Sequence, residues 1–138
     1  MKKIFIGFIS LGLAGLVAFS PIPAAAQDLA AFCSATPGPE EVLVFYLSFS
    51  GVIIRTAEAT IIIDPADLLL ESDIEKLKVL GADLLFYTHG HGDHFGLASA
   101  LEIFKATQAY VVAEPGVAAQ LRGKIPPREG RPCVGRRE

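Results

Sequence analysis

Residues 88–96 of the chain read Thr88-His89-Gly90-His91-Gly92-Asp93-His94-Phe95-Gly96. All three histidines of the 138-residue protein lie here within six positions, together with one aspartate. Imidazole and carboxylate are the usual protein ligands of Zn²⁺ and related divalent ions. In an extended loop His89 and His91 project to the same side, and the intervening glycines allow positive φ and a close approach of the backbone. The spacing therefore predicts a metal site.

Asp93 and His94 follow the expected bend of the loop and face a neighbouring position, where a second ion could bind. Two ions about 3.5–4 Å apart can together polarise a carbonyl or phosphoryl oxygen. Asp93 could serve as a metal ligand, as an orienter of the nucleophile, or as both. The competing interpretation is a set of ordinary loop histidines on a polar rim. Three histidines at H-x-H-x-D-H spacing, with none elsewhere in the chain, argue against it.

The flanking segments predict an α/β arrangement around this loop. An apolar strand is expected at 83–87 and a helix at 97–106, so the loop follows the carboxyl end of a strand, where α/β folds place ligand sites. A helix that starts with a Ser72–Glu75 capping box and ends at Gly81 should precede that strand.

The remaining ordered segments are short. A further strand is expected at 109–113, and one or two helical turns at 116–121.

Three β-rich stretches upstream, at 42–49, 52–56 and 59–63, are separated by short turns and predict an antiparallel meander. The run Ile61-Ile62-Ile63 is typical of a strand that is covered on both faces. Asp64-Pro65 ends this strand because proline has no N–H for the ladder. Asp64 either caps the following turn or directs its carboxylate to a site on the rim of the sheet, and the residues alone leave both interpretations open.

The first 26 residues have the pattern of a signal peptide: Lys2 and Lys3, an apolar run at 4–19, and Ala24 and Ala26 before the expected cleavage point. We therefore expect an exported protein, periplasmic or secreted after cleavage. The alternative is an uncleaved N-terminal membrane anchor, although the run is shorter than the roughly 20 residues that span a bilayer.

Composition limits the remaining possibilities. The net charge of −3 gives no case for a nucleic-acid partner. Residues 27–41 contain Pro37-Gly38-Pro39 and are expected to form a linker, and the basic Pro/Gly/Arg-rich tail at 122–138 should be poorly ordered. Cys33 and Cys133 could form a disulfide in an oxidising compartment or remain two free thiols.

The histidine motif resembles the H-x-H-x-D-H signature of the metallo-β-lactamase fold superfamily. The stretch Ile61-Ile62-Ile63-Asp64-Pro65 is similar to the strand that ends in an aspartate in that family. The form Thr-His-Gly-His-Gly-Asp-His most resembles metal-dependent hydrolases related to ascorbate-6-phosphate lactonase. The resemblance covers about residues 42–115.

This resemblance implies an αβ/βα sandwich with a one- or two-metal centre, usually of zinc. It also implies hydrolysis of an ester, lactone, amide or phosphoester by a metal-bound hydroxide. By this match His89 and His91 would bind the first metal, Asp93 and His94 would bind the second, and Asp93 would be the catalytic carboxylate. Asp64 would orient a ligand histidine from behind. Manganese, iron and nickel are alternatives to zinc, and the small-molecule substrate is not specified.

The chain departs from the family after the motif. The family completes its site with two further histidines and a bridging carboxylate from later segments. No histidine follows His94 here, and the later carboxylates match no family motif: Glu102, Glu114, Glu129 and Glu138. We therefore expect residues 42–121 to form a partial domain, the N-terminal half of the sandwich, in a truncated hydrolase. The alternative is a non-catalytic metal-binding or interaction fragment. In either case an exposed sheet face would favour a protein partner or self-association.

Overall fold

The computed structural model describes residues 6–11, 17–21 and 28–126. The expected cleavage point after Ala26, a Cys33–Cys133 pairing and most of the basic tail involve residues outside these ranges. In the described ranges, no helix has the length and apolar character needed to cross a membrane.

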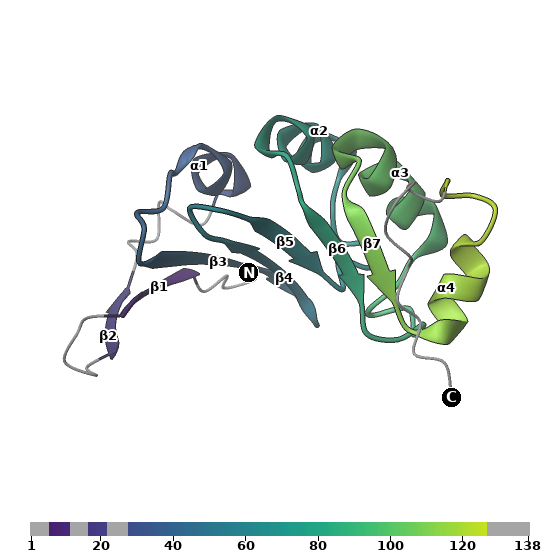
Figure 1. Ribbon diagram of the computed structural model, residues 1–138, viewed down its shortest axis with the longest axis horizontal. Coiled ribbons are helices and arrows are strands. Elements are labelled where there is room, and N and C mark those ends of the chain that lie inside the picture. The colour runs from purple at the N-terminus through teal and green to yellow at the C-terminus, as the bar shows by residue number, and fades with distance from the viewer. Residues whose placement is uncertain (1–5, 12–16, 22–27, 127–138) are drawn as a thin grey trace.

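One mixed sheet, in the strand order β2-β1-β3-β4-β5-β6-β7, forms the centre of the fold (Figure 1). The pairs β1-β2, β1-β3, β3-β4 and β4-β5 are antiparallel, whereas β6 pairs parallel with both β5 and β7. The antiparallel meander β3-β4-β5 is thus confirmed. The strands are β1 Ile6–Leu11, β2 Val17–Pro21, β3 Glu41–Ser48, β4 Gly51–Arg55, β5 Thr60–Ile63, β6 Leu84–Tyr87 and β7 Tyr110–Ala113.

The first two strands fall within the stretch predicted to be a signal peptide, and that assignment stays a prediction. The mixed α/β architecture of the rest agrees with a partial metallo-β-lactamase-type fold.

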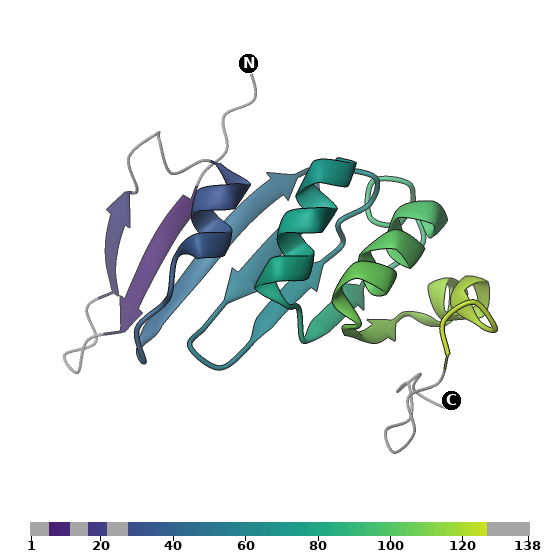
Figure 2. The same ribbon diagram turned by 90° about the horizontal axis from the view of Figure 1, so that it is seen from above.

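Three helices lie side by side over one face of the sheet, and a fourth follows β7 at its far end (Figure 2). The helices are α1 Leu29–Ser34, α2 Glu71–Leu80, α3 Leu97–Thr107 and α4 Pro115–Leu121. Apart from α1, each corresponds to a helix expected from the sequence. The parallel steps β5-α2-β6 and β6-α3-β7 each use a helix as the crossover, as parallel pairing requires.

Helix α1 corrects the prediction of a linker at 27–41. The Asp28 carboxylate accepts a hydrogen bond from the Ala30 amide at 2.9 Å, which makes Asp28 a side-chain N-cap. Leu29 and Phe32, three positions apart, are both buried in the core. Arg55 on β4 donates to three carbonyls at the carboxyl end of the helix. A short helix can form here because these tertiary contacts supplement its own few hydrogen bonds.

The start of α2 also differs from expectation. The helix begins at Glu71 with Leu70 as its N-cap, so the predicted Ser72–Glu75 capping box is wrong. Asp73 explains the earlier start, because its carboxylate accepts from the Leu70 amide at 3.3 Å and satisfies that donor. Gly81, with φ +69°, ends the helix as predicted.

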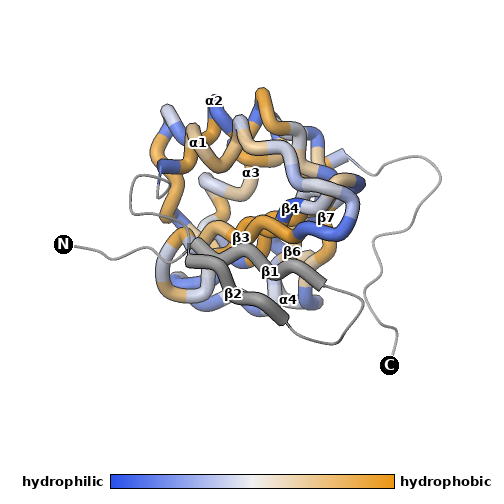
Figure 3. Tube along the Cα trace, turned by 90° about the vertical axis from the view of Figure 1, so that its left-hand side faces the viewer, coloured by the Kyte–Doolittle hydropathy of each residue, from blue (hydrophilic) through white to orange (hydrophobic). Residues whose placement is uncertain are grey.

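The two faces of the sheet are in different environments. On the helical face, Phe45, Ile53, Ile62 and Leu85 lie opposite one another in register and are buried in the main core. On the other face, a second set of residues lies in register across β3 to β7. These residues are only partly buried and do not belong to the main core: Val44, Ile54, Ile61, Leu84 and Tyr110. Figure 3 shows apolar colour in both the helical layer and the strands. In the described residues, therefore, the expectation that β5 is covered on both faces is wrong.

Candidate metal centre

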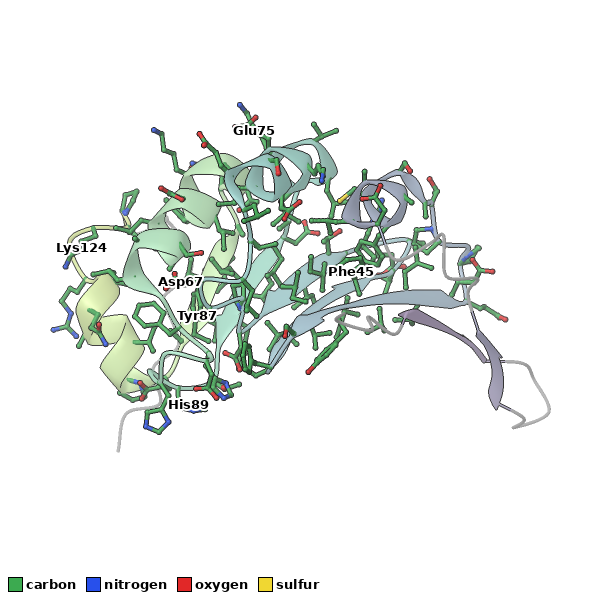
Figure 4. The ribbon with its side chains drawn as sticks, turned by 180° about the vertical axis from the view of Figure 1, so that it is seen from behind. Phe45, Asp67, Glu75, Tyr87, His89 and Lys124 are labelled. Atoms are coloured by element: carbon green, nitrogen blue, oxygen red, sulfur yellow. The ribbon has the colours of Figure 1, made fainter. Side chains whose placement is uncertain are left out.

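The histidine motif lies at the carboxyl ends of the parallel strands β5 and β6. Because these strands run in the same direction, Asp64 after β5 and Thr88 after β6 lie at the same end of the sheet, where both strands have their carboxyl ends. Figure 4 shows His89 at this end, beyond Tyr87. The sheet topology therefore brings together two segments of the chain that are 24 residues apart.

Asp64 is the buried polar residue at this end of the sheet, with 2% of its surface exposed. Its Oδ1 accepts from the Thr88 amide at 2.8 Å, and its Oδ2 accepts from the Thr88 hydroxyl at 2.5 Å. Oδ2 also lies 2.8 Å from His94 Nδ1. A carboxylate with three partners can be buried because hydrogen bonds to both of its oxygens offset the loss of hydration. The backbone of Asp64 has φ +43°, a left-handed conformation that directs the chain back beneath the motif.

These bonds determine which imidazole nitrogens carry a proton. A carboxylate only accepts, so His94 Nδ1 must donate to Asp64. The single hydroxyl hydrogen of Thr88 is also given to Asp64, which leaves Thr88 Oγ1 free to accept from His89 Nδ1 at 3.1 Å. In the neutral forms of His89 and His94, Nε2 is then unprotonated. A neutral imidazole whose other nitrogen donates to an oxygen is the form in which histidine binds metals.

His89, His91 and Asp93 each offer one ligand atom, and these three atoms lie within 4.8 Å of one another. His91 and Asp93 are exposed, and His89 is partly buried. The His94 ring packs against that of His89 with centroids 3.6 Å apart, and His94 Nε2 lies 3.6 Å from Asp93 Oδ2. The structure thus brings all four predicted ligand residues together, with His94 closest to Asp64.

This donor set fits a divalent metal ion. Two ligands that each bind zinc at about 2.1 Å can be at most about 4.2 Å apart. The observed 4.8 Å limit therefore requires only a small side-chain movement to close. Two imidazoles and one carboxylate match the ligand preferences of zinc and its neighbours. The exposure of His91 and Asp93 leaves an ion in reach of solvent and of a substrate.

The backbone of the motif is closed by local hydrogen bonds. The amides of His94 and Phe95 both donate to the His91 carbonyl, at 2.9 and 2.8 Å. Phe95 is buried and packs edge-on against Tyr87, with ring centroids 5.1 Å apart. Burial, together with the charges of Asp64 and Asp67, raises the pKa of Tyr87, so its ring remains neutral beneath the site. The loop is thus held from the core side by an aromatic pair.

Positive φ is used elsewhere than expected. Among the described glycines, those with positive φ are Gly81 and Gly123, so Gly90 and Gly92 do not use this freedom. Next to the motif, the left-handed residues are Asp64 and Ala66. The Ala66 amide donates to the His94 carbonyl at 3.1 Å, which fastens the loop after β5 to the histidine loop.

The later carboxylates have other contacts in the described structure. Glu114 accepts from the Val117 amide at 2.8 Å and caps α4, although its carboxylate lies beside Gly90. Glu102 lines a groove between α2 and α3. Glu129 and Glu138 lie outside the described residues. None of the described later carboxylates joins the group formed by His89, His91 and Asp93.

Two further residues at the site were given no role by the sequence. Thr88 contacts Asp64, His89 and His94, and the one signal for it is its position directly before the first histidine. Ser50, in the turn between β3 and β4, donates to the Asp93 carbonyl at 2.7 Å across 43 positions. A contact over so long a separation leaves no local trace in the sequence.

Comparison with protein families gives one match. The model described as "Metallo-beta-lactamase superfamily" matches residues 45–131, which include most of the meander, the Asp64 turn and the histidine motif. No curated protein and no solved structure matches the chain.

Proposed function

Since this chain belongs to the metallo-β-lactamase superfamily, we propose that its function is metal-dependent hydrolysis. The observation that carries this proposal is the cluster of His89, His91 and Asp93 at the ends of parallel strands, with His94 beside it on the buried Asp64. The proposed substrates are esters, lactones, amides or phosphoesters. A bound metal ion would supply a water nucleophile active at neutral pH and would polarise the substrate oxygen.

The residues have distinct proposed roles. His89 and His91 hold the first ion, Asp93 and His94 hold a second, and Asp93 also orients the attacking water. Asp64 holds His94 in the orientation and protonation state that metal binding needs. Zinc is the ion that we propose, because a mixed imidazole and carboxylate set suits it.

Three finer assignments are proposals of the same kind. The form of the motif supports a place among hydrolases that resemble ascorbate-6-phosphate lactonase. The sequence pattern of residues 1–26 supports export and cleavage near Ala26. The three-histidine motif and the strands around it support the assignment of residues 42–121 to the N-terminal half of the sandwich.

A second candidate function is metal binding without catalysis. It is favoured by the proposed two-ion assignment, which gives each ion two protein ligands, whereas a catalytic zinc ion usually has three. The partly buried row on the open face of the sheet supports the associated proposal of a protein partner or a second copy. Covering it would remove apolar surface from water. Light scattering of the purified chain measures whether it self-associates.

The test uses the full chain loaded with Zn²⁺. The two probe substrates are an aryl lactone and the phosphodiester bis(p-nitrophenyl) phosphate. We expect turnover that EDTA abolishes and that His91→Ala lowers at least about 100-fold. Glu102→Gln is the matched control, because it alters a charged side chain on α3 away from the motif and should retain full activity. Zinc binding without turnover would overturn the hydrolase in favour of the binding module. A chain that takes up no zinc would overturn both.

A further inference from the structure

The turn between β3 and β4 has an unusual backbone beside the metal centre. The strand register shifts between Tyr46 and Ser48, and the turn places two non-glycine residues at positive φ, Ser48 at +147° and Phe49 at +47°. Such conformations are unfavourable for residues with a Cβ and persist where surrounding contacts hold them. One such contact is the Tyr46 hydroxyl, which donates to the Phe49 carbonyl at 2.6 Å.

This turn packs against both loops of the site. Gly51 is buried, and a Cβ added there would lie 3.1 Å from the Asp64 carbonyl oxygen and 3.0 Å from the Leu68 side chain, so glycine suits the close approach. Ser50, directly before it, donates from Oγ to the Asp93 carbonyl at 2.7 Å. The geometry of the turn therefore fixes the position of the Ser50 hydroxyl relative to the histidine loop.

The contact matters because of the residue that receives it. The Asp93 carboxylate is 54% exposed and has His94 Nε2 as a neighbour at 3.6 Å. Its direction is therefore set mainly by the backbone that carries it. The neighbouring carbonyls are held by main-chain donors: His91 by the amides of His94 and Phe95, and His94 by the amide of Ala66. At Asp93 the donor is a side chain.

We propose that Ser50 is a positioning residue for the Asp93 metal ligand. By holding the Asp93 carbonyl, its hydroxyl restricts rotation of the peptide that joins Asp93 to His94 and so keeps the carboxylate directed toward the imidazoles. This inference rests on the proposed metal site and adds a residue that no ligand motif contains. Loss of the hydroxyl would leave the ligand in place but less well oriented, at a cost in metal affinity.

The test is the Zn²⁺ affinity of the full chain, measured by competition with a chromophoric chelator. Ser50→Ala should weaken it about tenfold, in line with the loss of an orienting hydrogen bond. Ser50→Thr retains the hydroxyl and should stay within about threefold of the wild type. Ser34→Ala is the matched control, because Ser34 likewise donates to a backbone carbonyl, that of Ala31 at 3.0 Å, in α1. Its zinc affinity should be unchanged.

The stability of the metal-free protein separates positioning from a purely structural role. Urea unfolding of metal-free Ser50→Ala and Ser34→Ala should show equal, small losses, whereas zinc affinity should fall in the first variant alone. Tyr46→Phe, which frees the turn while keeping Ser50, should lower zinc affinity in the same direction by a smaller factor.

Two results would overturn the role of Ser50: Ser50→Ala binding zinc within twofold of the wild type, or Ser50→Thr binding as weakly as Ser50→Ala. In both, the wild type binds zinc, so the proposed metal site stands and only the role of Ser50 is lost. A wild type that takes up no zinc is a different result and removes the proposed function together with this inference.

Discussion

Two aspartates of the site differ in nearly every physical respect. The Asp64 side chain is 3% exposed and has three hydrogen-bond contacts, whereas the Asp93 side chain is 54% exposed and has a histidine 3.6 Å away. The first joins β5 to the histidine loop, and the second is free to reach an ion. The comparison indicates that one residue type anchors the fold at one position and, as we propose, binds a metal ion at another, according to its burial and its hydrogen-bond partners.

The strongest way to break this comparison is Asp64→Ala. The change removes the buried acceptor that the Thr88 amide, the Thr88 hydroxyl and His94 Nδ1 share. We expect the free energy of unfolding to fall by about 3–5 kcal/mol. Urea unfolding of the metal-free protein measures it. A loss below about 1 kcal/mol would show that Asp64 does not anchor the fold.

A smaller loss is expected from Thr88→Val. Valine keeps the shape of threonine but removes the hydroxyl that donates to Asp64 Oδ2, while the amide of residue 88 still donates to Oδ1. The free energy of unfolding should drop by about 1–2 kcal/mol. Denaturation of Thr88→Ser, which retains the hydroxyl, is the control and should show less than half of this loss.

Tyr87→Phe should change stability in the opposite direction. The Tyr87 hydroxyl is buried and has no hydrogen-bond partner in the described part of the chain. Removing an unpaired buried hydroxyl while keeping the ring contact with Phe95 should raise the free energy of unfolding by up to about 1 kcal/mol. Thermal unfolding followed by circular dichroism measures the change. A clear loss of stability would show that the hydroxyl has a partner after all.

Asp93→Ala should have the smallest effect on folding and the most selective effect on function. An exposed carboxylate contributes little to the fold, so metal-free stability should change by less than about 0.5 kcal/mol. Zinc affinity should nevertheless fall at least about tenfold, as measured by chelator competition. If metal-free stability fell as far as in Asp64→Ala, the distinction between the two aspartates would be lost.

Much of the scaffold could be predicted because its signals are local. Strands β3 to β7 and helices α2, α3 and α4 follow from apolar patterning and from breakers such as Gly81, with ends that agree or differ by one or two residues. Helix α1 was missed because its two buried residues, Leu29 and Phe32, lie in a short stretch next to prolines. Its stability comes from contacts with β3 and β4 that sequence periodicity does not encode.

The candidate site likewise has some features that the sequence predicts and others that depend on tertiary contacts. The candidate ligand residues could be predicted because three histidines and one aspartate lie within six consecutive positions. The left-handed backbone at Asp64 and Ala66 was not, since neither residue type demands it. The Ser50 contact depends on a shift in strand register near Ser48, which arises only when β3 and β4 are paired. The ligand chemistry could be predicted from the residue types and their spacing, whereas the orientation of the side chains depends on the three-dimensional packing.

The order of the strands has a consequence for synthesis. From β3 to β7, position in the sheet follows position in the chain. During synthesis, each strand from β4 to β7 can therefore pair with the strand that precedes it in the chain. No strand has to insert between two strands that are already paired. Such neighbour-by-neighbour growth favours rapid pairing within the meander β3-β4-β5, because its loops are short, whereas the steps to β6 and β7 each close a longer connection that contains a helix. In this order the bonds from Asp64 to Thr88 and from Ser50 to Asp93 can form once β3 to β6 are paired, so the candidate metal centre closes before β7 joins the sheet.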